Sequence, residues 1–397
     1  MLGCLSTGVS GLSASNSDMS IIANNIANVN TPGYKARRAE FADLLSQQTG
    51  NMEIGTGVAI SNVSSVSSQG PLTATSNIYD LAIDGAGFFV VKDDRGLFYT
   101  RAGQFHKDKE GKLVTPKGQV VQGWMLQEGG GMVGSPSDIV ISNVSIPPKA
   151  TENVTMSVNL DSNTPLSAGA AFDPQDPSSS SSYSTSLSFF DSLGNRHDLT
   201  FYFRKQAENQ WEWHAFEGGT SLEQSGTLSF TAEGVLDSTT PGTGKVTFGG
   251  QVINVDFGGS TQFAAASFTT ALSQDGYEAG SLSRISITRE GIIQGTFTNG
   301  YSKDIARIAL ADFNNPDGLV HMGNNLYQAS AESGQPIINP PGAGGMGNIA
   351  AYSLENSNVD LAAEFVKMIV TQRAFQANAR TITTADQLLA ELVSLKR

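Results

Sequence analysis

The chain has one cysteine and few basic residues, and each shortage excludes a class of protein. Cys4 alone cannot form an intrachain disulfide framework or a CxxC metal site, and we expect it to be a small buried hydrophobic residue. Lys and Arg number 24 against 37 Asp and Glu, which gives a formal charge of −13. Because phosphate contacts need clustered cations, we expect no nucleic-acid partner.

A long continuous apolar segment is also missing. No run approaches the roughly 20 residues of a membrane span, so we expect no membrane insertion. Residues 1–34 contain no Lys or Arg and one acid, Asp18, and their apolar residues are spread periodically. A secretory signal instead has a basic start and a continuous apolar block. Export, if it happens, does not use that common route.

Patterns typical of catalysis are absent or lie in the wrong context. Residues 342–347 match GxGxxG, but Asn339-Pro340-Pro341 precedes them, whereas a dinucleotide site needs a preceding strand and a following helix. The histidines share no metal-ligand spacing, and no GxSxG elbow occurs. No sequence pattern supports a pair of catalytic carboxylates for glycoside cleavage, although the sequence alone does not exclude such a pair. We expect no enzymatic activity, no cofactor and no metal.

The C-terminal residues carry the strongest periodic signal. Steps of four and three give a stripe in which eight of ten positions are apolar, which predicts a helix over about 358–395, roughly 55 Å long. Ser357 with Asp360 resembles a capping box. A second apolar set widens the stripe, so one partner would not cover it. The stripe consists of Leu361, Phe365, Met368, Gln372, Phe375, Ala379, Ile382, Asp386, Leu389 and Val393.

The N-terminus repeats this spacing, and Pro32-Gly33 ends the pattern. Gly8 and Gly11 each cost about 1 kcal/mol relative to Ala, so we expect a marginal helix that is disordered in the free chain and folds on packing. The alternative is that the two terminal stripes simply cover each other in an ordinary monomer. The N-terminal stripe consists of Leu5, Val9, Leu12, Asn16, Met19, Ala23 and Ile26, and Ile22 widens it.

Between the ends the apolar period changes from 3.5 to 2, which predicts strands and hairpins. The expected fold class is α+β and multidomain, with the terminal helices paired as a coiled coil and nested, mainly-β domains between them. We expect 1–30 and 357–397 to form a helical axial domain and 31–70 to form a connector. Residues 71–145 and 284–356 should form an inner β domain, and 146–283 an outer β insert.

Two long segments carry a family resemblance. Residues 23–35 resemble the N-terminal signature of bacterial flagellar rod and hook axial proteins, and residues 357–378 are similar to the closing helix of that family. Residues 81–89 and 99–105 are also family-like. The outer β insert, which includes residues 190–199 and 275–282, resembles the outer domain of hook-type members. Distal-rod members of the family lack a large insert. The signature positions are Asn24, Asn25, Asn28, Pro32, Gly33, Asn358, Asp360, Gln372 and Arg373.

The resemblance implies a structural subunit that self-assembles into a flexible helical tube, a universal joint that transmits torque from rod to filament. It implies packing of the terminal helices along the axis and export of the unfolded chain, without a cleaved signal, to the extracellular hook. The implied partners are copies of the chain, rod and hook–filament junction proteins, the hook cap and the flagellar type III export apparatus. A distal-rod-type protein and a surface glycan-binding β protein are the alternatives.

One short motif follows from the same resemblance. Phe41, Leu44 and Leu45 are similar to the segment by which the flagellar type III gate recognises rod and hook substrates. A plain amphipathic turn would have the same pattern, and the sequence favours neither interpretation.

Overall fold

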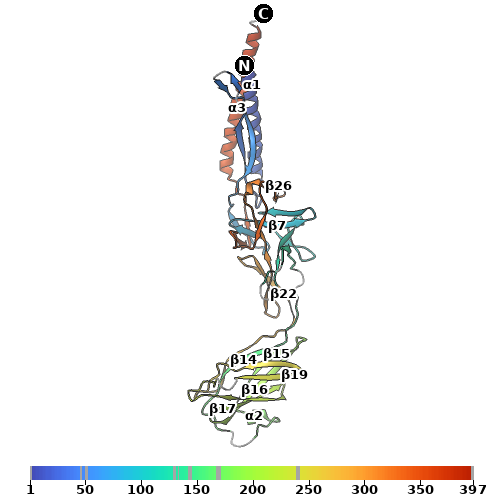
Figure 1. The fold of residues 1–397 in the computed structure, drawn as a ribbon, viewed down its shortest axis with the longest axis vertical. Coiled ribbons are helices and arrows are strands. Elements are labelled where there is room, and N and C mark those ends of the chain that lie inside the picture. The colour runs from blue at the N-terminus through green and yellow to red at the C-terminus, as the bar shows by residue number, and fades with distance from the viewer. Residues whose placement is uncertain are drawn as a thin grey trace. The chain divides into compact units, whose positions relative to one another are not determined.

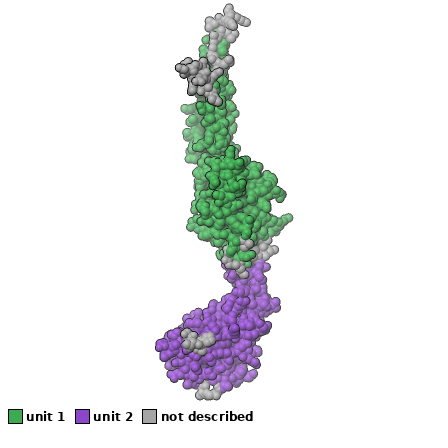
Figure 2. Space-filling model, viewed as in Figure 1, with its two compact units in different colours: residues 1–142, 285–295, 303–397 green, residues 143–284, 296–302 purple. Residues whose placement is uncertain are grey.

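The structure is a computed structural model, which describes residues 2–44, 47–49, 52–127, 131–132, 134–141, 145–166, 171–237 and 242–394. The chain folds into two compact units, coloured separately in Figure 2. Unit 1 contains residues 1–142, 285–295 and 303–397, and unit 2 contains residues 143–284 and 296–302. Unit 2 is therefore an insert within unit 1.

Two long helices at the chain ends pair within unit 1, as predicted (Figure 1). They are α1 (Leu2–Ala27) and α3 (Leu361–Ser394). The Asp360 carboxylate accepts hydrogen bonds from the backbone N–H groups of Ala362 (2.9 Å) and Ala363 (3.2 Å), so Asp360 caps α3 and the expected cap at Ser357 is wrong. Among the described helices, none combines the length and hydropathy that crossing a bilayer requires.

The segment 31–70, expected as a connector, contains regular structure. Strands β1 (Arg37–Asp43) and β4 (Val58–Ser65) form an antiparallel pair with a bulge between Glu40 and Phe41, and both contact α1. Figure 1 shows this pair along the helices. A second pair joins β2 (Gln47–Thr49) and β3 (Met52–Ile54). The segment thus packs on α1 instead of only linking domains.

The remainder of unit 1 is β structure around an aromatic core. One path of adjacent strands runs β24-β11-β7-β8-β27-β26, while β5 pairs with β30 and β6 with β29. Tyr99 packs edge-on against Phe313 at 4.8 Å between ring centroids, and both belong to a buried cluster with Phe88 and Tyr327. The strands up to residue 138 are β5 (Leu72–Ala74), β6 (Leu81–Asp84), β7 (Phe88–Asp93), β8 (Gly96–Thr100), β9 (His106–Lys107), β10 (Leu113–Val114), β11 (Val120–Met125) and β12 (Ser137–Asp138).

The strands of the returning chain complete this β structure. The short 3-10 helix η1 (Pro316–Gly318) lies among them. The first three of these strands also include residues of unit 2. The strands are β22 (Gly280–Ile287), β23 (Ile292–Phe297), β24 (Ser302–Ile308), β25 (Leu310–Asp312), β26 (Val320–Gly323), β27 (Leu326–Gln328), β28 (Ile337–Asn339), β29 (Asn348–Ala351) and β30 (Ser353–Glu355).

Unit 2 is a sandwich of two four-stranded sheets, ordered β19-β20-β14-β21 and β15-β16-β17-β18. Alternate residues of both sheets enter one core, in which Phe201, Phe203, Trp211 and Phe257 are fully buried. The elements are β13 (Ser145–Ile146), β14 (Asn153–Asn159), α2 (Pro177–Ser180), β15 (Tyr183–Phe190), β16 (Arg196–Ala207), β17 (Gln210–Glu217), β18 (Thr220–Ser229), β19 (Thr243–Phe248), β20 (Gln251–Asp256) and β21 (Phe268–Gln274).

One histidine joins two carboxylates at an end of this sandwich. His197 Nδ1 lies 3.0 Å from Glu217 Oε1, and His197 Nε2 lies 3.5 Å from Asp191 Oδ2. Hydrogen bonding to Glu217 raises the pKa of His197, against an opposing effect of desolvation. Hydrogen bonds, the strongest from Asn195, lower the pKa of Asp191 to about 2. Folded unit 2 therefore holds a proton on His197 more tightly than the unfolded chain does.

The stability from this contact should be present below the unfolded histidine pKa of about 6.5 and be lost as pH rises through the higher folded pKa. We expect the urea midpoint of unit 2, followed by peptide-resolved hydrogen exchange, to fall as pH rises through this range. The fall should be shallower in His197→Gln and unchanged in His106→Gln, an exposed control in unit 1. Equal pH slopes in His197→Gln and the unsubstituted chain would contradict the assignment.

Candidate assembly surface

Polar side chains connect the two terminal helices. The Thr371 hydroxyl donates a 2.8 Å hydrogen bond to Asp18 Oδ2, and Asn25 Nδ2 donates a 3.1 Å bond to Glu364 Oε2. Asn25 and Glu364 are both almost fully buried. Because residue numbers rise along α1 as they fall along α3 from contact to contact, the two helices run antiparallel.

Glycines let the helices approach closely. A Cβ atom at Gly8 would lie 2.9 Å from Ile382 Cγ1, and one at Gly11 would lie 2.7 Å from Asn378 Nδ2. Both distances are shorter than a Cβ atom allows, so a larger residue at either position would force Ile382 or Asn378 to shift. Gly8 and Gly11 lower the intrinsic helix propensity of α1, but their lack of a side chain leaves room for α3.

The predicted apolar stripes lie only partly in the contact between the helices, where Ile382 faces Gly8. Ile22 is buried, whereas Val9, Leu361 and Phe365 are exposed, and the side chain of Val393 lies outside those the structure describes. Glycines and polar pairs occupy the contact because they permit the close approach that larger apolar residues would prevent. Of the other stripe residues, Asn16, Ala23, Gln372 and Asp386 are exposed. The rest are half-buried: Leu5, Leu12, Met19, Ile26, Met368, Phe375, Ala379, Ile382 and Leu389.

An apolar face of α3 points away from α1. Its exposed fractions range from 40% at Leu361 to 62% at Val366, and the face consists of Leu361, Phe365, Val366, Ile369 and Val370. Exposed apolar residues gathered in this way are typical of protein interaction sites. We call these five residues of α3 the outer apolar face.

Cys4, in α1, is also exposed, so its expected burial is wrong.

The signature asparagines of α1 hold the chain as it leaves the helix. Asn25 Oδ1 accepts from the backbone N–H of Arg37 (2.9 Å), and Asn25 Nδ2 donates to the Arg37 carbonyl (2.8 Å). The Tyr34 hydroxyl donates to Asn24 Oδ1 at 2.9 Å, and Asn28 Nδ2 donates to the Asn24 carbonyl at 2.9 Å. These amides fix where β1 begins relative to α1.

The remaining signature residues lie around the same junction or on α3. Asn358 Oδ1 accepts from the backbone N–H of Ala36 at 2.7 Å, while Asn358 Nδ2 donates to the Val66 carbonyl at 2.8 Å. Gly33 has a φ of +70°, and a Cβ there would lie 2.5 Å from a backbone nitrogen, so only glycine fits. The Pro32 carbonyl accepts from Asn325, and Gln372 and Arg373 are exposed on α3.

A buried carboxylate gathers two cations beneath this junction. Glu355 Oε1 accepts from Lys35 Nζ at 2.6 Å and from the backbone N–H of Gly70 at 2.9 Å, and Glu355 Oε2 lies 3.4 Å from Arg101 Nη1. The three charged side chains are at most 7% exposed. Burial lowers the pKa of Lys35 and of Arg101, and the charge of Glu355 opposes both shifts. The cluster fastens three segments that are distant in sequence.

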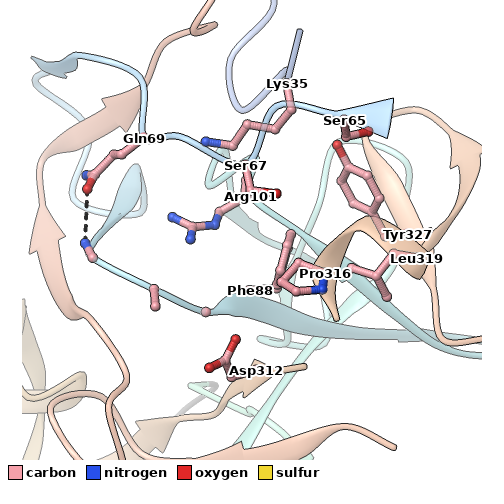
Figure 3. A pocket seen from close by; sticks show the side chains of 13 residues that line it. Lys35, Ser65, Ser67, Gln69, Phe88, Arg101, Asp312, Pro316, Leu319 and Tyr327 are labelled. Atoms are coloured by element: carbon pink, nitrogen blue, oxygen red, sulfur yellow. Dashed lines mark hydrogen bonds between the residues drawn. The ribbon is translucent and has the colours of Figure 1, made fainter. Parts of the chain in front are cut away.

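A cavity of about 290 Å³ lies beside this cluster (Figure 3). Lys35 and Arg101 line it together with Phe88, Leu319 and Tyr327. Its opening is mainly apolar, and Glu355 already engages both cations. The arrangement therefore serves packing and positioning better than chemistry.

The export motif candidate lies where β1 ends. Phe41 and Leu44 are 48% and 41% exposed, and Leu45 lies outside the described residues. Recognition of this segment by an export gate stays a prediction.

Apolar periodicity and motif spacing did not predict Glu355 or its ion pairs with Lys35 and Arg101. Lys35 is the last residue of the N-terminal signature, directly after Pro32-Gly33-Tyr34, and Glu355 stands two residues before the closing segment. Their positions next to the two signatures were the available signal, but only the tertiary structure shows that they meet.

Comparison with known proteins places most of the chain within four family models. They are Flagella basal body rod protein (residues 5–35), Flagellar hook protein FlgE/F/G D1 domain (82–161), Flagellar basal body protein FlaE D2 domain (159–277) and Flagellar basal body rod FlgEFG protein C-terminal (350–395).

Full-length relatives carry the same name. Flagellar hook protein FlgE of Borreliella burgdorferi is 38% identical and that of Treponema pallidum 36%, each alignment covering 100% of both chains. The Salmonella typhimurium protein is 34% identical over 98% of this chain and 99% of its own. The crystal structure of Helicobacter pylori flagellar hook protein FlgE2 has a similar fold, with a TM-score of 0.54 and 17% identity over 72% of this chain and 100% of that chain.

Removal of the Glu355 charge should destabilise unit 1. In Glu355→Gln two buried cations lose their counter-charge, so we expect the free energy of unfolding to fall by about 3–5 kcal/mol. The matched control, Glu40→Gln, breaks the exposed pair with Arg38 and should change it by about 0–1 kcal/mol. Urea unfolding with peptide-resolved hydrogen exchange measures both, and a similar small change in both variants would contradict the assigned role.

Proposed function

The chain belongs to the flagellar hook protein FlgE family as a subunit of the flagellar hook, and we propose that it assembles with copies of itself into a flexible helical tube. In this proposal the tube is a universal joint that transmits torque from rod to filament. The resemblance to rod and hook axial proteins drawn from the sequence is confirmed by the family matches. The distal-rod and glycan-binding alternatives are not favoured.

The observation that carries self-assembly is the outer apolar face of α3. The antiparallel contact with α1 uses glycines and polar pairs on the other side of the helix, and the exposed residues cluster within the first ten positions of α3. Covering this face with neighbouring copies would remove the apolar area from water, at about 25 cal/mol per Å². The predicted axial packing of the terminal helices becomes, in this proposal, packing between subunits.

Bending and torque transmission place different demands on the two units. Stiffness in rotation requires well-packed contacts, which the helices and the aromatic core of unit 1 would supply. Bending requires contacts that change as each subunit turns. Acidic residues outnumber basic ones by more than two to one in unit 2. The surfaces of this unit on neighbouring copies would therefore repel each other and would not form a tight, fixed contact. Water between polar surfaces would allow them to slide.

The proposal includes export of the unfolded chain by the flagellar type III apparatus, without a cleaved signal, to the extracellular hook. Recognition would use Phe41, Leu44 and Leu45. The low intrinsic helix propensity of the glycine-containing α1 supports passage as an unfolded segment. Rod proteins, hook–filament junction proteins and the hook cap are the proposed partners beside copies of the chain itself.

Truncation of both ends tests the function directly. A chain lacking residues 1–34 and 357–397 keeps Lys35, Glu355 and both β cores, so we expect it to fold and to lose polymerisation. Circular dichroism measures folding, and sedimentation with electron microscopy measures polymers of the full and truncated chains. Binding or cleavage of glycans by the truncated chain would instead contradict the structural function.

Charges on the outer apolar face should abolish assembly without unfolding the subunit. Val366 and Val370 are each more than 60% exposed, so the pair of changes Val366→Glu and Val370→Glu leaves the contact with α1 intact. We expect normal helix content and no polymers by sedimentation. Gln376→Glu, a change at an exposed position of the same helix, should polymerise normally. Polymers of the double variant at the usual subunit concentration would refute the role of this face.

A further inference from the structure

Unit 1 has a second cavity, at the C-terminal end of α1, and its charged side chains are all basic. The volume is about 520 Å³, and Arg37, Lys117 and His321 line it. None of the described residues along its walls is Asp or Glu, although acidic residues outnumber basic ones 37 to 24 in the whole chain. We call it the basic cavity.

Hydrogen bonds hold the walls of the basic cavity in place. Asn24 and Asn28 form one side and are tied to Tyr34 and to each other. Asn325 forms another part and donates a 2.9 Å bond to the Pro32 carbonyl. The amides thus shape the walls, and the Arg37 guanidinium and the Lys117 ammonium supply N–H donors to a guest. A carboxylate, which accepts hydrogen bonds on both oxygens, is the complementary group.

Arg37 is fixed at its backbone by the Asn25 side chain. The Asn25 side chain bonds both the N–H and the carbonyl of Arg37, which positions the start of its side chain. Within the part of the chain that the structure describes, neither Arg37 nor Lys117 forms an ion pair. Burial and the nearby Arg37 charge lower the pKa of His321, so at neutral pH the positive charge comes from Arg37 and Lys117.

We propose that the basic cavity binds a carboxylate side chain of a second copy of this chain in the polymer. The inference rests on the proposed function, because a subunit in a polymer meets other copies at high local concentration. With a net charge of −13, the surface of another copy offers mostly carboxylates. The cavity also belongs to the same unit as the outer apolar face, so unit 1 carries both the apolar and the charged surface of this proposal.

The two surfaces would have different roles. Burial of the outer apolar face supplies affinity without direction. A carboxylate held by the planar guanidinium of Arg37 fixes register and orientation, since charge complementarity contributes specificity and association rate more than raw affinity. Copies would thus attract each other through the helices and align through the basic cavity.

The test is polymerisation of an Arg37→Gln and Lys117→Gln double variant. We expect the subunit concentration required for polymerisation to rise about tenfold or more, and its dependence on NaCl between about 0.05 M and 0.5 M to weaken. The matched control is Arg38→Gln, at the next residue of β1, whose side chain pairs with exposed Glu40. It should polymerise as the unsubstituted chain does. Circular dichroism verifies folding, and Lys117→Gln alone, on an exposed turn, provides a milder variant.

The outcomes are separable. Polymerisation of the double variant at the normal concentration and with the normal salt dependence overturns the inference and leaves the proposed function intact. An equal loss in Arg38→Gln also overturns it, because the effect would then follow total charge. Normal polymers combined with lost binding of a polyglutamate probe would assign the cavity to another acidic partner, again overturning the inference. Failure of the unsubstituted chain to polymerise would contradict the proposed function itself.

Discussion

The organisation of this protein depends on holding the outgoing and returning parts of the chain together where the helices meet the β structure. Glu355 does this from the returning chain, by engaging Lys35 from the outgoing one and Arg101 from β structure between them. A buried ion cluster contributes little net stability over an apolar equivalent, but it strongly disfavours arrangements that separate its charges. Its position therefore suits a nested chain, in which α1 and α3 can pair only if residues far apart in sequence are correctly aligned.

The amides around this cluster extend the same constraint to the helices. Asn25 joins α1 to β1 and to Glu364 of α3, and Asn358 joins the entry of α3 to the end of the β1–β4 pair at which β1 begins and β4 ends. Each amide satisfies buried backbone or carboxylate groups that would otherwise be costly to leave without a partner. The family signature is thus a set of hydrogen-bonding positions at one junction, which explains its richness in asparagine.

The distribution of apolar residues separates folding from assembly. Unit 2 has its own aromatic core, shared by its two sheets. The helices, in contrast, meet through glycines and polar pairs and leave the outer apolar face of α3 exposed. A subunit built in this way keeps much of its apolar helical surface for other copies. In the proposed polymer, the acidic surface of unit 2 and the basic cavity of unit 1 would decide which contacts between copies are tight and which stay loose.

The sequence by itself determined the paired terminal helices, the β structure between them and the family. Apolar periodicity and long signatures can be recognised in a sequence without knowing which residues are in tertiary contact. It did not determine which face of each helix meets the other. Stripes such as Leu5–Val9–Leu12 and Leu361–Phe365–Met368 follow the apolar pattern, yet Gly8, Gly11, Thr371 and Glu364 make the contact. Close approach and buried hydrogen bonds depend on geometry between distant residues, and apolar periodicity contains no information about either. For the same reason only the tertiary structure revealed the Glu355 cluster and the basic cavity, whose members are single charged residues scattered along the chain.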